Sequence, residues 1–292
     1  MGIKNTLTIF LGKIIVKALR LIGKNAGNLP GLILCGINKN ALSAFKVECP
    51  IIAVTGTNGK TSVTNYLSYI FKNYSGNIIT NSQGNNLDTG ICSLLLDKCD
   101  IRGRIKADFL VLETDESHVP VVYSKLKLQT LVLLNLFRDQ LDRNGEVETL
   151  ILKIKGFLDT FEGNVVLNAD DPNIARLGKA NPNNKNIFYF SVERYSGATN
   201  EPYEVGEGKF CPFCGTKLTY DYYQYSHIGR FHCDKCGFGN IKPFVEVKNV
   251  NQSVPSFEVN GETYRTRHNS IYYMYNRYVF KNHIKNRSIT WH

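Results

Sequence analysis

The chain has 292 residues, which is enough for one or two domains with a buried core. Its 43% hydrophobic and 11% aromatic residues are typical of a globular protein and exclude a disordered one. The formal net charge of +10, from 35 basic and 25 acidic residues, favours anionic partners such as nucleotides, membrane surfaces or nucleic acids, although a basic but ordinary surface accounts for it as well.

The first predicted element is an amphipathic helix near the N-terminus. Its apolar residues recur at helical spacing: Leu7, Phe10, Ile14, Ala18, Leu21 and Ile22. Lys13, Lys17 and Arg20 interrupt the apolar run, which is therefore neither a membrane span nor a clean signal peptide. We expect the helix to pack on the core and to end at the Gly-, Asn- and Pro-rich segment 25–31, with a helix on a membrane surface as the alternative. The first residues also match the short myristoylation pattern, which is weak support for an anchor.

A glycine-rich loop follows the next predicted element, a buried strand at 51–54. The loop 55–62 reads Thr-Gly-Thr-Asn-Gly-Lys-Thr-Ser, and a helix is predicted after it at 63–71. A strand, a glycine loop and a helix in this order are the setting of a phosphate-binding loop. The strict pattern has a further glycine at the position of Val54, so this loop is a shortened variant. We expect it to bind ATP rather than to form a structural turn.

The chemistry expected of this loop depends on its amides and on a few side chains. Backbone N–H groups at a helix start converge on phosphate oxygens, and the helix dipole adds partial positive charge. Lys60 would neutralise the β- and γ-phosphates, and the Thr61 hydroxyl would bind Mg²⁺ together with the Glu113 carboxylate. An alternative role for Glu113 is that of a charge at a helix N-terminus. The expected ATP-binding residues of the loop are Gly56, Thr57, Asn58, Gly59, Lys60, Thr61 and Ser62.

Further buried strands are predicted at 109–112, 130–135, 164–168 and 187–190, and a helix at 146–157. Strands that alternate with helices indicate an α/β fold with a mostly parallel sheet. In such sheets, ligands bind at the carboxyl ends of the strands. Glu113, Asn135 and Asn168 come at strand ends, as the glycine loop does.

Four cysteines farther along the chain predict a small inserted metal module. They form two Cys-x-x-Cys pairs separated by 18 residues: Cys211, Cys214, Cys233 and Cys236. Four thiolates make a closed, structural Zn²⁺ site of the zinc-ribbon kind, and the paired spacing indicates a reducing, cytoplasmic setting. A redox dithiol, an iron–sulfur centre and aromatic stacking on nucleic acid are the alternatives. His227 and His232 lie within the module, but four cysteines leave no need for them as ligands.

The last predicted element is a hairpin at 255–264, with Asn-Gly at 260–261 as its turn. The predicted organisation therefore has five parts. They are an N-terminal helix and linker at 1–45, a central ATP-binding domain at 46–200, the zinc ribbon at 201–245, a returning hairpin and final helix at 246–280, and an irregular tail at 281–292.

Several motifs together resemble the Mur ligases and folylpolyglutamate synthases, which use ATP to join carboxylates to amines. The glycine loop is shared across that family. More narrowly, the chain is similar to the branch that amidates lipid II, in Glu-Thr-Asp-Glu at 113–116, Asn-Leu-Phe-Arg-Asp-Gln-Leu-Asp-Arg at 135–143, Asn-Ala-Asp-Asp-Pro at 168–172, Leu-Pro-Gly at 29–31 and the four-cysteine insert. The resemblance covers roughly residues 20–276 and implies a Mur-ligase-type central domain with an inserted zinc module.

This resemblance implies an ATP-dependent carbon–nitrogen ligase of peptidoglycan synthesis. The α-carboxylate of D-glutamate in the lipid II stem peptide would become an acyl-phosphate, and ammonia from a GatD-type glutaminase partner would convert it to D-isoglutamine. Lys60 and Glu113 would serve catalysis. Asn168, Asp171 and Asn276 would contact the nucleotide, although the first two also suit a turn that closes a strand. We expect a cytoplasmic protein, with a peripheral place at the inner face of the membrane as an option, and no nucleic-acid partner.

Two rival functions are weighed against this one. Gln140 stands where amino-acid-adding Mur ligases usually have histidine. Because glutamine is a poorer metal ligand, this position and the zinc module argue against an amino-acid-adding or folylpolyglutamate-type ligase. The other rival is an ATP-binding zinc-ribbon module for nucleic acid, and the basic residues around the ribbon are too few to decide for it: Lys209, Lys217, Arg230 and Lys235.

The C-terminal segment departs from the family pattern. Asn276 is kept, but Tyr273 replaces an earlier asparagine, and bulky residues follow in place of alanines. The family continues with a C-terminal domain that closes over ATP and binds the glutaminase, and we expect this chain to lack it. A truncated or frame-shifted product would fold and bind ATP and zinc, and we do not expect amidation by this chain alone.

Overall fold

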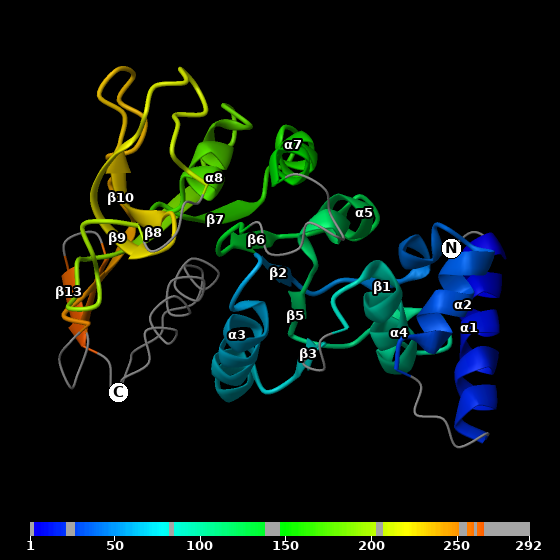
Figure 1. Cartoon of the computed structure of the whole chain (residues 1–292). Helices are drawn as coiled ribbons and strands as arrows, with labels where there is room; N and C mark the ends of the chain where they lie inside the picture. Colours follow the sequence, from blue (N-terminus) through cyan, green and yellow to red (C-terminus); the bar gives the residue numbers. More distant parts are fainter. Residues whose placement is uncertain are drawn as a thin grey trace. The chain divides into compact units, whose positions relative to one another are not determined.

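A computed structural model describes residues 3–21, 27–81, 85–137, 147–202, 207–250, 256–259 and 262–265. These residues belong to two compact units, Met1–Val132 and Leu133–His292. Each unit combines parallel β-strands with helices, as the ribbon in Figure 1 shows. The predicted α/β fold with a mostly parallel sheet is therefore confirmed.

The first unit is built on buried strands. In sheet order they are β6 (Thr130–Leu133), which ends at the unit boundary, β2 (Ile51–Thr55), β5 (Phe109–Glu113) and β3 (Ile78–Thr80). Every residue of β2 and β6 is buried, as expected for strands covered on both faces. The strands predicted at 51–54 and 109–112 are confirmed, and the one predicted at 130–135 ends two residues early. β2 and β5 run parallel, with Val54 opposite Glu113.

Helix α3 (Lys60–Ser75) follows the glycine loop and begins before the predicted start at residue 63. Gly59 precedes it with a left-handed φ of 83°, a conformation that costs glycine little. Val63, Leu67 and Phe71 are buried along one side of the helix. Phe71 also packs on Phe109 of β5, with ring centroids 4.6 Å apart. This packing fixes the start of the helix next to the end of β2.

Several short elements of the first unit were not predicted from the sequence. They are β3, α2 (Leu29–Ile37), α4 (Asp88–Lys98), α5 (Val119–Tyr123), the 3-10 helices η1 (Ala41–Ala44) and η2 (Glu116–His118), and the parallel pair β1 (Lys46–Val47) and β4 (Arg104–Ile105). The start of α2 coincides with the Leu-Pro-Gly sequence that predicts a break. Proline fits the first turn of a helix because its missing N–H has no partner there.

The N-terminal helix α1 (Ile3–Leu21) is present and packs on its unit as predicted, but not with the apolar side that its spacing indicated. Leu7, Phe10 and Ile14 of its apolar stripe are exposed, whereas Ile9 and Val16 on the other side are buried. Both sides of the helix are apolar, so spacing alone could not tell which side is covered. Across the residues that the structure describes, no helix is long and apolar enough to cross a membrane.

The second unit has its own set of strands, which are coloured green to orange in Figure 1. In sheet order they are β13 (Glu262–Arg265), β12 (Ser256–Val259), β11 (Val245–Lys248), β8 (Ile187–Val192) and β7 (Asn164–Asn168). β7, β8 and β11 are parallel, and β12 and β13 form an antiparallel hairpin. The strand predicted at 164–168 is confirmed, and the strand predicted at 187–190 is two residues longer. The two strands of the predicted hairpin are also confirmed, but its turn at 260–261 lies outside the described residues.

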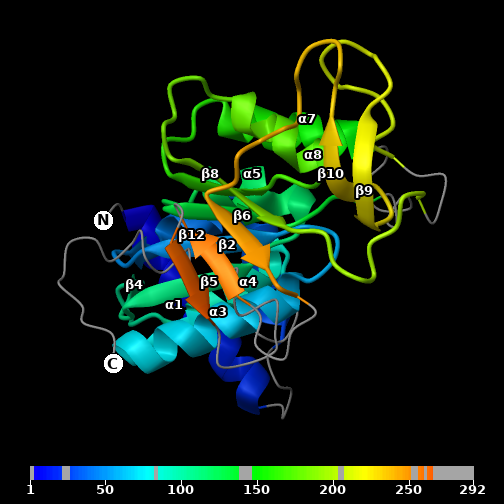
Figure 2. The ribbon, with the colours of Figure 1, turned by 90° about the vertical axis from the view of Figure 1, so that its left-hand side faces the viewer.

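The helices of the second unit are α7 (Val147–Leu158), close to the helix predicted at 146–157, the short α8 (Pro172–Ala175) and the 3-10 helix η3 (Arg176–Lys179). A separate two-stranded ribbon, β9 (Thr219–Tyr225) and β10 (Ile228–His232), lies between β8 and β11 in the chain and is drawn in yellow in Figure 2. The four cysteines flank this ribbon. The domain limits set from composition stay predictions.

Gly31 is the point of closest approach between α2 and α4. A Cβ atom at this position would lie 1.9 Å from the carbonyl oxygen of Thr89 and 2.8 Å from the amide nitrogen of Ser93. These are backbone atoms, so the helices themselves would have to separate. We expect Gly31→Ala to lower the free energy of unfolding by about 1–3 kcal/mol, measured by urea denaturation.

Gly36 in the same helix is the matched control, because a Cβ atom there has nothing within 4 Å. Gly36→Ala should leave the stability unchanged or raise it by up to ~1 kcal/mol, since alanine favours the helix. Equal effects of the two substitutions would contradict the close packing of α2 on α4.

Candidate functional site

The glycine loop joins the end of β2 to the start of α3. Gly56 and Gly59 have φ angles of 139° and 83°, so both stand where a side chain would be strained. Lys60 opens the helix, and Thr61 and Ser62 follow it in the first turn with exposed side chains. The free N–H groups of this turn and the helix dipole form a site for an anion. The structure therefore provides the setting that the sequence predicts for phosphate binding.

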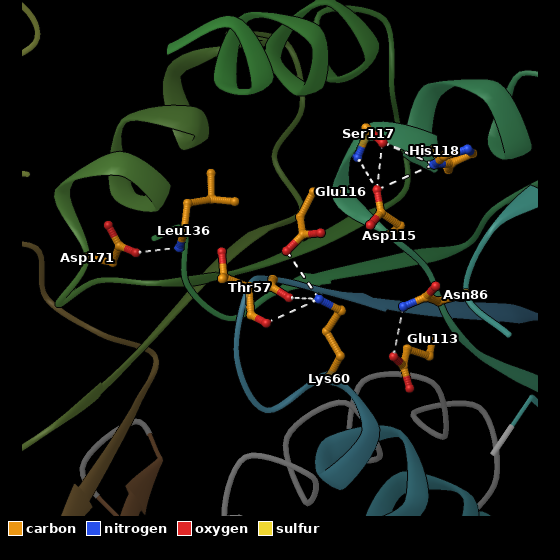
Figure 3. A network of polar contacts seen from close by, with 11 residues as sticks. Thr57, Lys60, Asn86, Glu113, Asp115, Glu116, Ser117, His118, Leu136 and Asp171 are labelled. Atoms are coloured by element: carbon orange, nitrogen blue, oxygen red, sulfur yellow. Dashed lines mark hydrogen bonds and ion pairs between the residues drawn. The ribbon is translucent and has the colours of Figure 1, made fainter. Parts of the chain in front are cut away.

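Lys60 is buried and its ammonium group is held by three oxygens (Figure 3). Its Nζ donates hydrogen bonds to the carbonyl oxygens of Gly56 and Thr57, the latter at 3.2 Å. It also lies 3.3 Å from Oε1 of Glu116, and both side chains of this ion pair are nearly inaccessible to water. The loop thus surrounds the Lys60 ammonium group, which the sequence predicts to bind the β- and γ-phosphates.

Glu116 is a site residue that the sequence analysis did not single out. It belongs to the short helix η2, three positions after Glu113, and its side chain faces the glycine loop. Burial raises the pKa of Glu116, and the nearby Lys60 opposes this rise. The only signal in the sequence was the acidic run that follows β5. Glu116 supplies negative charge of the kind that a buried lysine requires.

Glu113 is held at the end of β5 by two asparagines. The side-chain amide of Asn81 accepts a hydrogen bond from the Glu113 amide at 2.8 Å and donates one to its carbonyl oxygen at 2.7 Å. Asn86 donates to Oε1 of Glu113 at 3.2 Å. The second carboxylate oxygen, Oε2, is buried and has no hydrogen-bond partner among the described residues. A buried carboxylate oxygen without a partner fits a metal ligand, because leaving it bare is costly.

Asp115, between Glu113 and η2, is the centre of a second group of polar contacts. Asp115 caps this helix, and its Oδ1 accepts hydrogen bonds from the amide and hydroxyl of Ser117 at 3.0 and 2.6 Å. His118 Nδ1 lies 3.4 Å from the same oxygen, and His118 Nε2 lies 3.8 Å from Asp88 Oδ1. Burial alone would raise the pKa of Asp115, but the bonds from His118 and Ser117 outweigh it and lower the pKa to about 2. Asp115 thereby fixes the backbone that carries Glu116.

The predicted nucleotide contacts Asn168 and Asp171 lie in the second unit, at the end of β7. Asn168 donates to the carbonyl oxygen of Leu134 at 3.0 Å and accepts from the amide of Asp170 at 2.9 Å. Asp171 is fully buried, accepts from the amide of Leu136 at 3.0 Å (Figure 3) and caps helix α8. Both residues therefore close the strand end, and their contacts with a nucleotide stay a prediction.

Two other residues used in the sequence analysis, Gln140 and Asn276, lie outside the described residues. Their predicted roles, in separating family branches and in contacting the adenine, stay predictions.

The hairpin between β9 and β10 is tied to this same strand end. His227 at its turn is buried, and its Nε2 lies 3.3 Å from Oδ1 of Asp171. Phe137 packs on the imidazole with ring centroids 4.9 Å apart. Asp170 accepts from the side-chain amide of Gln224 at 3.0 Å, and its carbonyl oxygen accepts from the amide of Gly229 at 2.8 Å. The ribbon and the strand end are thus one hydrogen-bonded structure.

The four predicted metal ligands come together beside the ribbon. Their sulfur atoms all lie within 4.8 Å of one another: Cys211, Cys214, Cys233 and Cys236. Two of the sulfur–sulfur distances are 3.4 and 3.5 Å. Four sulfurs around a tetrahedral Zn²⁺, each at about 2.3 Å from the metal, would be about 3.8 Å apart, so the cluster needs only a small adjustment.

The two cysteine turns have the same backbone geometry. In each, the amide of the first cysteine donates to the carbonyl oxygen five residues later, from Cys211 to Thr216 at 2.8 Å and from Cys233 to Phe238 at 2.7 Å. Gly215 and Gly237 follow the second cysteines with φ angles of 72° and 70°. Such repeated turns direct two thiols each toward one point, which fits a metal better than a single redox pair.

Basic and aromatic side chains in and beside the ribbon contact other groups of the second unit. Arg230 pairs with Glu246 at 2.6 Å, and Lys179 lies over the ring of Phe213, 4.5 Å from its centroid. The aromatic rings of Phe231 and Phe238 belong to a small core with Cys211 and Cys233. Aromatic residues here thus build the module itself.

The sequence around the glycine loop matches a known protein family. The family model described as the Mur ligase middle domain matches residues 54–231. The matched range begins at the last buried position before the glycine loop and extends into the ribbon.

Relatives of known identity are similar over most of this chain. One is the lipid II isoglutaminyl synthase (glutamine-hydrolyzing) subunit MurT of Staphylococcus aureus strain N315, with 33% identity over 79% of this chain and 51% of that protein. Another is the subunit of the same name from Streptococcus pneumoniae, with 31% identity over 94% of this chain and 61% of that protein. The chain therefore spans roughly half to three fifths of the length of these curated relatives.

A solved structure shares the fold. A pseudomurein peptide ligase type C from Methanothermus fervidus superposes with a TM-score of 0.60 at 23% identity, over 86% of this chain and 52% of that one. At this identity, the likeness concerns the fold alone.

The His227–Asp171 pair should make stability depend on pH. Burial disfavours the imidazolium, but Asp171, and more weakly Glu207, outweigh it and raise the pKa of His227 above its ordinary value near 6.5. The charged pair therefore stabilises the fold fully below pH 6.5, and this contribution is lost as pH rises through the raised pKa. We expect His227→Gln to lower the free energy of unfolding by about 3 kcal/mol near pH 6, with a smaller loss above neutral pH.

The measurement is urea denaturation of the wild type and of His227→Gln across this pH range. His232→Gln is the control, because this histidine is only partly buried and its acidic neighbours, Asp221 and Asp234, are exposed. A deficit of His227→Gln that stays constant with pH would show that the imidazole acts by packing alone.

Proposed function

This chain belongs to the Mur ligase family, and from that premise we propose that it performs the ATP-dependent step in the amidation of lipid II. The proposed substrate is the α-carboxylate of D-glutamate in the stem peptide, and the product is D-isoglutamine. The observation that carries this proposal is the glycine loop with buried Lys60 and, on the neighbouring strand, Glu113 with its unpaired carboxylate oxygen.

The proposed reaction has two steps. A carboxylate oxygen attacks the γ-phosphorus of ATP, the bond to the β-phosphate oxygen breaks, and ADP leaves. Ammonia then attacks the carbonyl carbon of the acyl-phosphate, inorganic phosphate leaves, and a proton is lost from nitrogen. The first step develops charge on the phosphoryl oxygens, so the protein has mainly to position groups and to balance this charge.

The residues of the first unit suit that task. Lys60 would exchange its contact with Glu116 for phosphate oxygens, while the amides at the start of α3 bind the phosphates. Glu113 and Thr61 would hold Mg²⁺, which, when bound, neutralises phosphate charge. Asn168, Asp171 and Asn276 would serve the nucleoside end of ATP. The parallel register of β2 and β5 puts Glu113 opposite Val54, the residue before the glycine loop. This supports the proposal that Glu113 binds a metal ion beside phosphates held by the loop.

The proposed partner is a glutaminase of the GatD type that supplies the ammonia. The relatives from Staphylococcus aureus and Streptococcus pneumoniae are named as subunits of a glutamine-hydrolysing synthase, which supports this assignment. Those relatives are longer than the part that this chain matches, so the complete amidation reaction is proposed for this chain and not observed. We also propose that the protein is cytoplasmic and reaches lipid II at the membrane surface.

We also propose that the four cysteines bind one structural Zn²⁺. The closed set of four sulfurs leaves no position for a substrate, so the metal would stabilise the ribbon and, through His227, the strand end with Asp171.

The nucleotide site can be tested on this chain by calorimetric titration with MgATP. Lys60→Ala removes the charge expected on the phosphates and should weaken binding by roughly 30- to 150-fold, equivalent to about 2–3 kcal/mol. Lys72→Ala is the matched control, because Lys72 is exposed on the same helix. Glu113→Gln keeps the size of the side chain and should reduce the difference between titrations with and without Mg²⁺. Equal affinity of Lys60→Ala and wild type would remove the loop from ATP binding.

The reaction itself is tested with lipid II, glutamine, ATP and a GatD-type glutaminase, with the product analysed by mass spectrometry. This chain is compared with a version that carries the family's complete C-terminal domain, and we expect the product from the extended version. Conversion of one carboxylate to an amide lowers the mass by about one unit and should depend on ATP and on Lys60. Attachment of an amino acid in place of ammonia would assign the chain to the amino-acid-adding ligases. ATP binding without either product would leave the nucleotide site intact and reject the proposed substrate.

The metal is tested by elemental analysis of the purified chain. We expect one zinc per chain, lost in Cys211→Ser/Cys233→Ser, together with a lower melting temperature. Cys49→Ser is the control, because Cys49 lies outside the cluster. Iron in place of zinc, or full zinc content in the double variant, would contradict the assignment.

A further inference from the structure

The two N-terminal helices expose an unusual amount of apolar surface. We call this surface the α1–α2 face. It consists of Leu7, Phe10, Ile14 and Leu21 on α1 and Leu29, Leu32, Ile33 and Ile37 on α2. Phe10 is 62% exposed, Leu21 is 80% exposed and Ile37 is 62% exposed. Large apolar side chains exposed together on two packed helices indicate an interaction site.

The face is presented by a well-anchored pair of helices. α1 and α2 lie side by side, with α4 next to them (Figure 1). Gly12 of α1 comes so close to Leu34 of α2 and Leu96 of α4 that a Cβ atom there would lie 2.4 Å from a methyl group of Leu96. Asn38 donates a hydrogen bond to the Thr8 hydroxyl at 2.9 Å, joining the helices a second time. The exposed residues are therefore the outer side of packed helices.

Lys13 explains why α1 presents this side and not the other. Its ammonium group donates to the carbonyl oxygens of Leu96 and Cys99, both at 2.6 Å, at the C-terminal end of α4. A lysine at a helix C-terminus neutralises the free carbonyl groups there. This contact fixes the rotation of α1, so that Ile9 and Val16 are buried while Phe10 and Ile14 face outward.

The charged residues of α1 and α2 themselves are all basic. Neither α1 nor α2 contains an aspartate or a glutamate, and the described basic side chains of α1 are Lys13 and Lys17. Lys13 is engaged with α4, whereas Lys17 is exposed, and so is Lys39 just after α2. Exposed apolar residues on helices that carry exposed lysines and no acidic residue match the acyl and headgroup layers of an anionic membrane.

We propose that the α1–α2 face docks the protein on the surface of an anionic lipid bilayer. The apolar side chains enter the boundary between headgroups and acyl chains, and the basic residues contact the lipid phosphates. The helices lie along the surface, since neither is long and apolar enough among the described residues to cross a bilayer. A protein partner would normally match the exposed lysines with acidic groups, whereas a lipid surface supplies that charge uniformly. This inference depends on the exposed surface alone and not on the proposed reaction.

Sedimentation with lipid vesicles tests the proposal without ATP or substrate. The full chain should sediment with vesicles of phosphatidylglycerol and phosphatidylcholine, and much less with phosphatidylcholine alone. Phe10→Asp/Ile14→Asp should weaken binding to the anionic vesicles by about tenfold or more. Lys17→Gln should weaken it by roughly fivefold. The matched control is Ile101→Asp/Leu152→Asp. These two residues lie outside the α1–α2 face and are similarly exposed, at 81% for Ile101 and 58% for Leu152. The control variant should bind vesicles as the wild type does.

Three results would overturn the proposal, provided that circular dichroism shows each variant to be folded. The first is a wild type that stays in the supernatant with anionic vesicles. The second is equal sedimentation of Phe10→Asp/Ile14→Asp and the control. The third is a lipid-free dimer, seen by analytical ultracentrifugation, that Phe10→Asp/Ile14→Asp dissociates, because the face would then be an interface between two copies of the chain.

Discussion

The parallel pairing of β2 with β5 is the constraint on which the candidate ATP site depends. It places the end of one strand, where the glycine loop begins, beside the end of the other, where Glu113 stands. The amide of Thr114 continues the pairing by donating to Val54 at 2.9 Å. Asn81, at the residue after β3, then holds the Glu113 backbone from the other side. Three strand ends thus fix one carboxylate with respect to one phosphate loop, which is the usual location of ligands in parallel sheets.

Electrostatics explains the remaining polar contacts of that site. A lysine as buried as Lys60 requires negative charge nearby, and Glu116 and two carbonyl oxygens provide it. Glu116 is itself kept in place by η2, whose first turn Asp115 caps. The Oε2 atom of Glu113 is the complementary case, because it is a buried acceptor that has no donor within the described part of the chain. Lys60 suits a phosphate anion, and the Glu113 oxygen suits a metal cation. ATP with bound Mg²⁺ contains both.

The second unit shows how a small inserted module can support a strand end. The ribbon has a thin core of Leu218, Phe231 and Phe238 around two of its cysteines, so a cross-link by metal would add to its stability. Its hairpin in turn buries His227 against Asp171 and binds Asp170 through Gln224. The cysteine cluster is therefore connected to the polar end of β7 through a continuous set of buried contacts, within one compact unit.

The sequence by itself determined the strand–loop–helix order, the strands ending at Glu113 and Asn168, and the four cysteines, because each depends on local spacing or on residue types with few alternatives. Only the tertiary structure decided that Glu116 pairs with Lys60, since 56 positions separate them and the turn at η2 sets the direction of the side chain. It also decided which side of α1 is exposed. Both sides are apolar, and the contact of Lys13 with the end of α4, far away in the chain, selects one of them.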